Sequence, residues 1–335
     1  MKKSLLVLAV LGAFTSVATA QSSVTLFGIV DMNLRYTKND GAGNRKSMGT
    51  SGINSERLGF RGVEDLGGGL KAGFHLEGAM SGDDGTAAGQ QWRRRSTVSL
   101  MGGFGELRLG RDYTPSFWNT TIFDPFGTNG AASSLNVARF VGQTTYVRDN
   151  NTVGYFLPAL GGLYGQFQIA PSEGVAGQKY TGGRIGFAAG PVNIAGAVGS
   201  QDVDLAGNNK FKTFNIAGSY KIGPANLMAQ YNNEKIDTNP EQKEVRILLG
   251  TAITMGQGEF RFSWVRSDDK SVADNDATQI GIGYVYNLSA RTALYGHGAN
   301  INNKRGARFA IAGGNAAPTA GGKSTGYEFG LRHSF

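Results

Sequence analysis

Hydrophobic and polar residues alternate along most of the chain, beginning at Val24. Even positions from Val24 to Tyr36 are mostly apolar, and odd positions such as Asp31 and Arg35 are polar. Successive side chains of a β-strand point to opposite faces, so this pattern predicts a strand with one apolar and one polar face. The same alternation recurs down the chain, whereas helical periodicity is scarce. The pattern predicts an all-β protein.

Sixteen segments with this alternation can be placed along the chain. Most have about the 9 to 11 residues that a tilted strand needs to cross a bilayer. The predicted strands are 24–36, 56–63, 70–80, 91–101, 105–112, 146–157, 162–170, 180–189, 192–200, 211–221, 225–233, 243–253, 258–267, 277–286, 291–301 and 325–335.

The connections between these segments alternate between short and long. Every second one is a tight turn, such as Gly67-Gly68-Gly69 or Gly190-Pro191. The others are long and polar, and cover 37–55, 81–90, 113–145, 171–179, 201–210, 234–242, 268–276 and 302–324. This order places all short turns at one end of the sheet and all long loops at the other, as in an antiparallel up-and-down meander.

The simplest fold of this kind is a closed transmembrane β-barrel of 16 strands, with short periplasmic turns and long external loops. Lipid then covers the apolar face, and closure pairs the two edge strands. A soluble β-sandwich is the alternative. It would leave sixteen amphipathic strands in a single meander without a second layer to cover their apolar faces.

Composition narrows the class of protein further. The chain has 335 residues, 52 of them Gly, and its apolar content of 40% is too high for a disordered chain. A mean hydropathy of −0.23, with no apolar run near 18 residues in the body of the chain, excludes a helical membrane bundle. Zero Cys excludes thiolate metal sites, and the three His are dispersed, so we expect no cofactor and no metal.

The N-terminus has the pattern of a secretory signal peptide. Met1-Lys2-Lys3 is cationic, residues 5–14 are apolar, and Ala18-Thr19-Ala20 supplies small residues for cleavage. We expect residues 1–20 to be removed and residues 21–335 to form a single barrel domain. Removing two lysines lowers the net charge from +8 to +6.

Several segments carry a resemblance to a known family. They are Ser23-Val24-Thr25-Leu26-Phe27-Gly28, the segment from Arg57 to Phe74, Arg94-Arg95-Ser96-Thr97-Val98-Ser99-Leu100, Phe104-Gly105-Glu106-Leu107-Arg108-Leu109-Gly110-Arg111 and the terminal Gly330-Leu331-Arg332-His333-Ser334-Phe335. Over essentially the whole mature chain the sequence resembles the general porins of Gram-negative bacteria, and most closely their anion-selective branch in β-proteobacteria.

The resemblance implies a homotrimer in the outer membrane, in contact with lipid and lipopolysaccharide. It also implies a third external loop folded into the pore, and passive diffusion of small hydrophilic solutes with a preference for small anions. The longest internal loop, 113–145, is the candidate for this constriction. The aromatic C-terminal strand resembles the family's outer-membrane assembly signal.

Arginines are the expected filter of the channel. Strand parity points Arg57 and Arg148 into the lumen, and a barrel of about sixteen strands leaves an aqueous channel. By resemblance, Arg57, Arg94 and Arg148 form the basic wall of the constriction, with Glu77 and Asp124 as acidic counterparts. Arginines facing carboxylates create a transverse field that concentrates anions.

Strict alternation conflicts with Arg94. If Val98 and Leu100 face lipid, Arg93 and Arg95 point inward and Arg94 points outward, so a bulge or a protein interface is needed to accommodate it. We therefore add Arg93 and Arg95 as further pore-lining candidates. Arg61 and Arg35 are further pore-lining candidates.

Two alternative functions stay open. A substrate-specific porin, for sugars or for phosphorylated or organic anions, would use the same barrel. An outer-membrane hydrolase would need a Ser and His pair on neighbouring strands, and the sequence offers no such motif, so we expect no enzyme. Basic residues are interleaved with acidic ones, so no nucleic-acid partner is expected.

Overall fold

The computed structural model describes residues 23–86 and 91–335. The expected signal peptide, residues 1–20, lies outside these ranges, as do residues 87–90 of a predicted loop. Among the described residues, no helix combines the length and the apolar character needed to cross a membrane.

Strands make up most of the described chain, and one pair of short helices interrupts them. The strands are β1 (Ser23–Asn39), β2 (Gly43–Thr50), β3 (Arg57–Gly67), β4 (Leu70–Ala79), β5 (Arg95–Gly102), β6 (Gly105–Tyr113), β7 (Arg148–Phe156), β8 (Leu163–Ala170), β9 (Tyr180–Ala189), β10 (Val192–Asp202), β11 (Lys210–Ile222), β12 (Ala225–Ile236), β13 (Gln242–Met255), β14 (Gly258–Asp269), β15 (Ala277–Asn287), β16 (Thr292–Asn303) and β17 (Lys323–Ser334). The helices are α2 (Pro115–Ile122) and the 3-10 helix η1 (Ser134–Val137).

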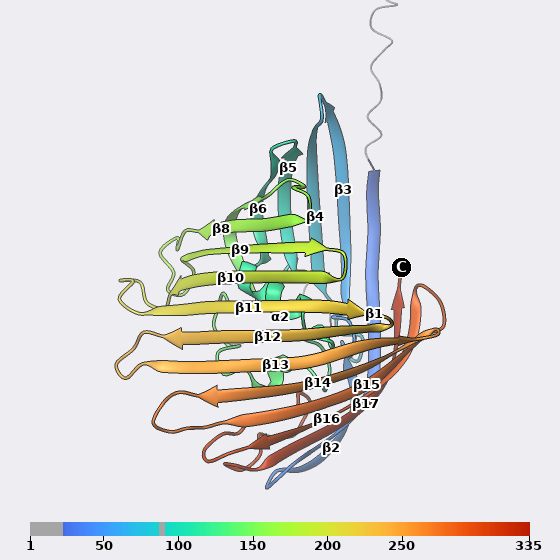
Figure 1. Cartoon of the computed structure of the whole chain (residues 1–335), viewed down its shortest axis with the longest axis vertical. Coiled ribbons are helices and arrows are strands. Elements are labelled where there is room, and N and C mark those ends of the chain that lie inside the picture. Colours follow the sequence, from blue (N-terminus) through green and yellow to red (C-terminus); the bar gives the residue numbers. More distant parts are fainter. Residues whose placement is uncertain (1–22, 87–90) are drawn as a thin grey trace, which may run out of the picture.

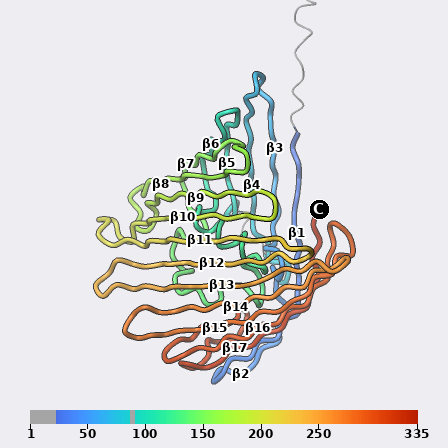
Figure 2. The backbone as a smooth tube through the Cα atoms, viewed as in Figure 1, coloured from blue at the N-terminus to red at the C-terminus, as the bar shows by residue number. Residues whose placement is uncertain are grey.

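All strands pair antiparallel in one sheet that closes on itself (Figures 1 and 2). β1 forms the seam, because it pairs with β17 on one edge and with β2 and then β3 on the other. β2 and β3 share that edge one after the other, so the ring has sixteen positions. Gly28 and Phe335 exchange both backbone hydrogen bonds at 3.1 Å, which fixes the last residue on the first strand. The predicted closed barrel is confirmed.

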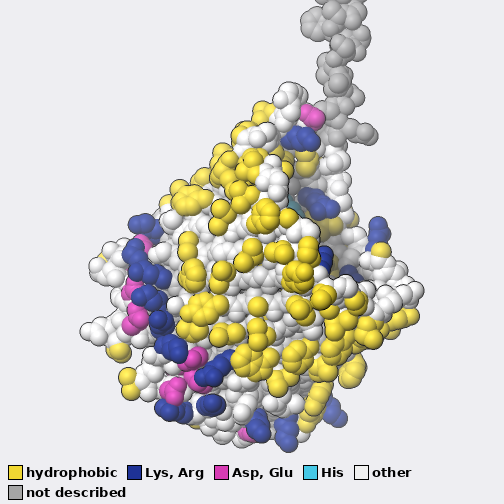
Figure 3. All heavy atoms as spheres, viewed as in Figure 1, with side chains coloured by type: hydrophobic (Ala, Val, Ile, Leu, Met, Phe, Trp, Pro, Cys, Tyr) yellow, Lys and Arg dark blue, Asp and Glu magenta, His cyan; other side chains and the backbone are white. Residues whose placement is uncertain are grey.

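The alternation of the sequence becomes the two faces of the barrel wall. On β5, Val98 and Leu100 are exposed on the outer face, whereas Thr97 and Ser99, which alternate with them, are buried on the inner face. Figure 3 shows the outer surface of the barrel. It carries a broad band of hydrophobic side chains, and charged side chains gather at the loop ends of the strands. This distribution is the one that a lipid-facing barrel requires.

The short turns depend on glycine. Between β3 and β4, Gly67, Gly68 and Gly69 have φ angles of 85°, 60° and 83°, a left-handed conformation that other residues adopt at a cost. A tight reversal at this end keeps adjacent strands in register.

Two strand predictions are wrong in detail. Part of the predicted loop 37–55 is a strand, because β2 pairs antiparallel with the second half of β1. The predicted strand 91–101 begins only at Arg95.

The inner loop, residues 114–147 between β6 and β7, folds into the barrel. Its helix α2 lies against the inner face of β8–β11, and Asn119 donates to the Asn215 side chain at 3.1 Å. Farther along, Phe126 and Val137 pack against inward-facing Leu248 of β13. The helices were not predicted, although Thr114 followed by Pro115 is a typical helix start.

Candidate functional site

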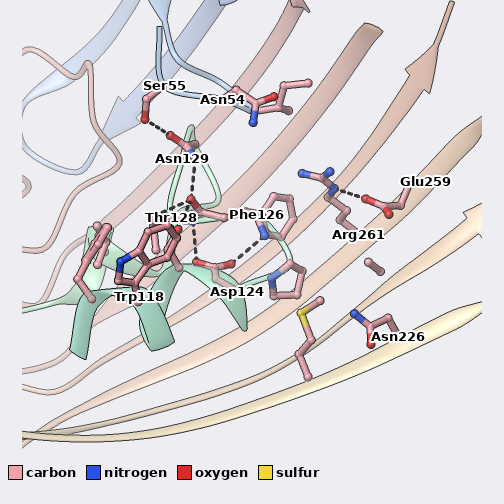
Figure 4. Close-up of a pocket in the computed structure, with 18 of the residues that line it drawn as sticks. Asn54, Ser55, Trp118, Asp124, Phe126, Thr128, Asn129, Asn226, Glu259 and Arg261 are labelled. Atoms are coloured by element: carbon pink, nitrogen blue, oxygen red, sulfur yellow. Dashed lines mark hydrogen bonds and ion pairs between the residues drawn. The ribbon is translucent and has the colours of Figure 1, made fainter. Parts of the chain in front are cut away.

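A cavity of about 1060 Å³ lies in the lumen between the inner loop and the barrel wall. Figure 4 shows Trp118 and Asp124 of the inner loop on one side, with Arg261 and Asn226 projecting from the strands opposite. Its lining is partly polar and charged, as in an aqueous channel. The inner loop thus narrows the barrel.

Three arginines line one side of this cavity. Arg57 is the first residue of β3, Arg94 precedes β5 directly, and Arg148 is the first residue of β7. All three lie at the start of strands that run in the same direction, at the same end of the barrel. We call Arg57, Arg94 and Arg148 the arginine wall.

Tyr113, the last residue of β6, holds two members of the arginine wall together. Its hydroxyl oxygen accepts hydrogen bonds from Nη2 of Arg148 at 2.7 Å and from Nη2 of Arg94 at 3.3 Å. The Arg148 guanidinium lies 4.2 Å from the centroid of the Tyr113 ring, in a cation–π contact. The ring also stacks on Phe117 and meets the edge of Trp118, with centroids 5.1 and 5.0 Å away. The inner loop therefore supports the arginine wall from behind.

Glu77 of β4 lies among the arginines. Its Oε1 accepts a hydrogen bond from Nε of Arg94 at 2.5 Å and lies 3.4 Å from Nη1 of Arg57. Its Oε2 lies 3.3 Å from Nε2 of His75. The sequence predicts carboxylates that face the arginines across the lumen, whereas Glu77 is on the same side. One carboxylate among three guanidinium groups leaves an excess of positive charge.

Asp124 borders the cavity, but its carboxylate faces its own loop. Oδ1 accepts a hydrogen bond from the amide of Phe126 at 2.8 Å, and Oδ2 accepts from the amides of Thr128 and Ser134 at 3.2 Å. Burial raises the pKa of the Asp124 carboxyl, although these hydrogen bonds act in the opposite direction. The contacts assign Asp124 to the shape of the inner loop.

The far side of the cavity carries polar residues that the sequence pattern does not single out. β12–β14 lie across the ring from β4–β6. There, Nε of Arg261 donates to Oε1 of Glu259 at 2.7 Å, and Asn226 stands nearby (Figure 4). Strand alternation predicts that Asn226, Glu259 and Arg261 point inward. An inward position alone does not show which residues lie at the constriction.

The conflict over Arg94 disappears in the structure. β5 begins at Arg95, so strand alternation does not apply to Arg94, whose amide donates to the carbonyl of Glu77 at 3.0 Å. Arg95 points inward as expected and donates from Nε to Thr97 at 3.2 Å. Arg93 is exposed before the strand, and its carbonyl accepts from Arg111.

The remaining two candidates differ from each other. Arg61 is exposed on β3, and its guanidinium lies 5.3 Å from the centroid of the Phe27 ring. Arg35 points inward but is buried, because it donates from Nη2 and Nε to Oε2 of Glu328 at 2.6 and 2.9 Å. The prediction that Arg35 lines the pore is wrong, because the carbonyl of Ala312 covers its Nη1.

The partner of Arg35 anchors the inner loop. Oε1 of Glu328 accepts a hydrogen bond from the amide of Ala131, in the inner loop, at 2.9 Å. The same oxygen lies 3.1 Å from Nδ1 of His297, and the Glu328 side chain is fully buried. One carboxylate on β17 therefore connects the loop to β1 and β16.

A second carboxylate does the same farther along the loop. Oε2 of Glu244 on β13 accepts from the amide of Arg139 at 3.0 Å, and its Oε1 accepts from Ser267 at 2.6 Å. Nearby, Nη2 of Arg246 donates to the hydroxyl of Tyr146 at 2.8 Å. These anchors hold the loop at a fixed height in the lumen.

Three carboxylates outside the lumen have the spacing of a metal centre. Asp268, Asp274 and Asp276, around the connection between β14 and β15, place ligand atoms within 4.8 Å of one another. Nζ of Lys270 lies 2.6 Å from Oδ2 of Asp268, and Nη2 of Arg305 lies 2.8 Å from Oδ2 of Asp274. These cations supply counter-charge, so we assign no metal to the group.

Comparisons with known proteins agree with this architecture. The family model described as Gram-negative porin matches residues 7–306. The chain is 41% identical to outer membrane porin protein 32 of Delftia acidovorans, with 100% of both chains covered. It is 29% identical, again over 100% of both chains, to the major outer membrane protein P.IB of Neisseria meningitidis serogroup A.

Solved structures give the same result. The anion-selective porin from Comamonas acidovorans superposes with a TM-score of 0.87 at 38% identity, covering 94% of this chain and 100% of the other. The OmpT protein of Vibrio cholerae shares the fold with a TM-score of 0.73 at 16% identity, covering 94% and 98% of the two chains.

Proposed function

Since the chain belongs to the Gram-negative porin family and forms a channel of the outer membrane, we propose that this channel passes small anions in preference to cations. Diffusion through it is passive, and the arginine wall is the filter. The same preference is stated in the name of the anion-selective porin that superposes on this chain.

The excess of positive charge at the constriction supports this proposal. Arg57, Arg94 and Arg148 line one cavity, and Glu77 is their only carboxylate partner among the described ion pairs. Across the cavity, Arg261 is balanced by Glu259 at 2.7 Å. Lys221 also lines the cavity, and none of the described ion pairs includes it, so the local field is set by the arginine wall together with Lys221.

Arginine suits this role because its guanidinium stays charged at physiological pH, even beside other cations. A narrow aqueous passage with low-dielectric walls focuses the field of such groups, which raises the local concentration of anions. Glu77 and Tyr113 fix the arginines, so the charges stay at the lumen instead of folding away.

A reversal potential tests the proposal. With the purified protein in a planar bilayer and a tenfold KCl gradient, we expect a potential of the sign given by chloride permeation. A value of zero, or one of the opposite sign, would contradict anion selectivity while leaving the porin fold intact.

We also propose that the functional form is a homotrimer, because one V. cholerae OmpT structure with this fold is described as a trimer form. Gel mobility before and after boiling tests it, since the trimer should migrate as one species and dissociate on heating. Migration as a monomer in both samples would contradict it.

Residues 1–20 are proposed as a cleaved signal peptide. N-terminal sequencing of the protein from outer membranes should begin at Gln21. A first residue of Met1 would contradict it.

No catalytic role is proposed. His75 contacts Glu77, His297 contacts Glu328, and the Nδ1 atom of His333 contacts Thr292 at 2.9 Å. None of these hydrogen bonds joins a histidine to a serine, which is the pairing that a barrel hydrolase requires.

A further inference from the structure

His75 of β4 lies beside the arginine wall on the inner face of the barrel. It points to the same side as Glu77, two residues later, while Phe74 between strands of lipid-facing residues is 37% exposed on the outer face. Nε2 of His75 lies 3.3 Å from Oε2 of Glu77. The other carboxylate oxygen of Glu77 contacts Arg94 and Arg57. The imidazole therefore joins this cluster without competing with the arginines for Oε1.

The other two histidines of the chain have different surroundings. The side chain of His297 is fully buried against Glu328. On β17, His333 has the parity of Leu331, which is exposed on the outer face. His75 is thus the histidine whose charge can act on ions at the constriction.

The imidazole of His75 can gain a proton and keep its contact with Glu77. A neutral imidazole has a single N–H, and beside a carboxylate we assign it to Nε2, which then donates to Oε2. The lone pair is left on Nδ1, and none of the hydrogen bonds found within residues 23–86 and 91–335 involves that atom. The side chain is 17% exposed, so water in the lumen reaches the ring.

Charges of both signs surround this imidazole. Directly opposite His75 in the sheet are Arg61 of β3 and the uncharged Thr97 of β5 (strands side by side in Figure 1). From β1, the Phe27 ring meets the imidazole edge to face, with centroids 5.2 Å apart. The charged groups around His75 and its partner carboxylate are Arg57, Arg61, Glu77, Arg94 and Arg95. The carboxylate attracts a charged imidazole, whereas the guanidinium groups repel it.

We propose that His75 is a further selectivity-determining residue of the channel, which strengthens the preference for anions as the pH of the medium falls. The inference rests on the proposed anion selectivity. Histidine is the side chain whose charge ordinarily changes between pH 5 and 8. Three arginines and Glu77 carry a net charge of two, and a protonated His75 raises it to three.

Reversal potentials at pH 8 and pH 5 test the proposal. The purified protein is placed in a planar bilayer with a tenfold KCl gradient around a mean of about 0.1 M. The chloride-to-potassium permeability ratio of the wild type should rise about twofold between pH 8 and pH 5. One added charge at about 8 Å acts with opposite sign on the two ions, and salt at this concentration screens part of its effect.

Three variants assign the response to His75. His75→Gln keeps an N–H donor for Glu77 but does not titrate, so its ratio should be equal at both pH values. His75→Lys carries a charge at both pH values and should give the higher ratio at each. His333→Gln removes a histidine from the outer face and should respond to pH as the wild type does.

A wild-type ratio that is equal at pH 8 and pH 5 would overturn the proposal. An equal rise in His75→Gln would also overturn it, and would assign the response to carboxylates of the lumen instead. If His75→Gln does not refold, His75→Lys decides, since a rise as large as that of the wild type would contradict the role of His75. A channel without anion preference at pH 8 contradicts the proposed function alone, because the change between the two pH values is still measured.

Discussion

Arg148 and Tyr113 are joined twice, by a hydrogen bond of 2.7 Å from Nη2 to the phenol oxygen and by a cation–π contact of 4.2 Å. The two residues come from opposite ends of the inner loop, at the start of β7 and the end of β6. The contact closes the base of the loop and places a guanidinium at the lumen. The position of one guanidinium of the arginine wall thus depends on a neutral residue.

Tyr113→Phe should weaken anion selectivity without removing a charge. The ring and its stacking remain, but Arg94 and Arg148 lose a shared acceptor, so their guanidinium groups become mobile. We expect the chloride-to-potassium permeability ratio to fall by about twofold, since a displaced charge acts over a longer, screened distance. Tyr155→Phe, whose hydroxyl is exposed on the outer face, is the control and should have no effect.

Arg57→Ser with Arg148→Ser should enlarge conductance and lower selectivity together. Each charge at about 8 Å from a permeating ion contributes roughly 0.5 kcal/mol in water, with opposite sign for chloride and for potassium. Losing both charges therefore changes the permeability of each ion by about fivefold, and the ratio of the two by about 25-fold before screening by salt. Single-channel currents and reversal potentials measure the two effects. The same pair of substitutions at exposed Arg45 and Arg305 serves as the control. An unchanged ratio in the Arg57 and Arg148 variant would place the filter elsewhere.

Anion selectivity should decline as salt rises. The Debye length falls from about 10 Å at 0.1 M to 3 Å at 1 M, so the arginine wall acts over a shrinking part of the lumen. Reversal potentials at a fixed concentration ratio, repeated at increasing mean KCl, measure this. A ratio independent of salt would point to direct, site-by-site binding instead of a field.

Glu328→Gln should loosen the inner loop. The variant leaves Arg35 buried without its counter-charge, and removing one partner of a buried pair costs about 3 kcal/mol or more. We expect a lower temperature of trimer or barrel dissociation on gels and noisier single-channel currents. Glu64→Gln, at an exposed position on β3, is the matched control. Wild-type noise and stability in Glu328→Gln would show that the loop is held by its other contacts.

Much of the barrel could be predicted from alternation alone. The parity of Val98 and Leu100 identifies the lipid-facing side of β5, and the glycines at 67–69 identify a tight turn. The conformation of the inner loop does not follow from alternation. Thr114 and Pro115 indicate a helix start, but the helix is stabilised by its contact with the wall, which no local pattern describes.

Charge assignments show the same limit. The sequence indicates that Arg35 and Arg57 point inward, and both do, but Arg35 is buried against Glu328 whereas Arg57 lines the cavity. Parity gives the direction of a side chain and not what lies in front of it. Glu77 was expected to face the arginines and instead stands among them.

The sequence by itself determined the class of fold, the order of short turns and long loops, and the face of the wall on which most strand residues lie. These features follow from a period of two residues and from turn chemistry, which are local. Only the tertiary structure decided which inward residues meet at the constriction, because those contacts join residues such as Ala131 and Glu328 that lie far apart in the chain. The height of the inner loop in the lumen determines which contacts form, and buried carboxylates on distant strands hold the loop at that height.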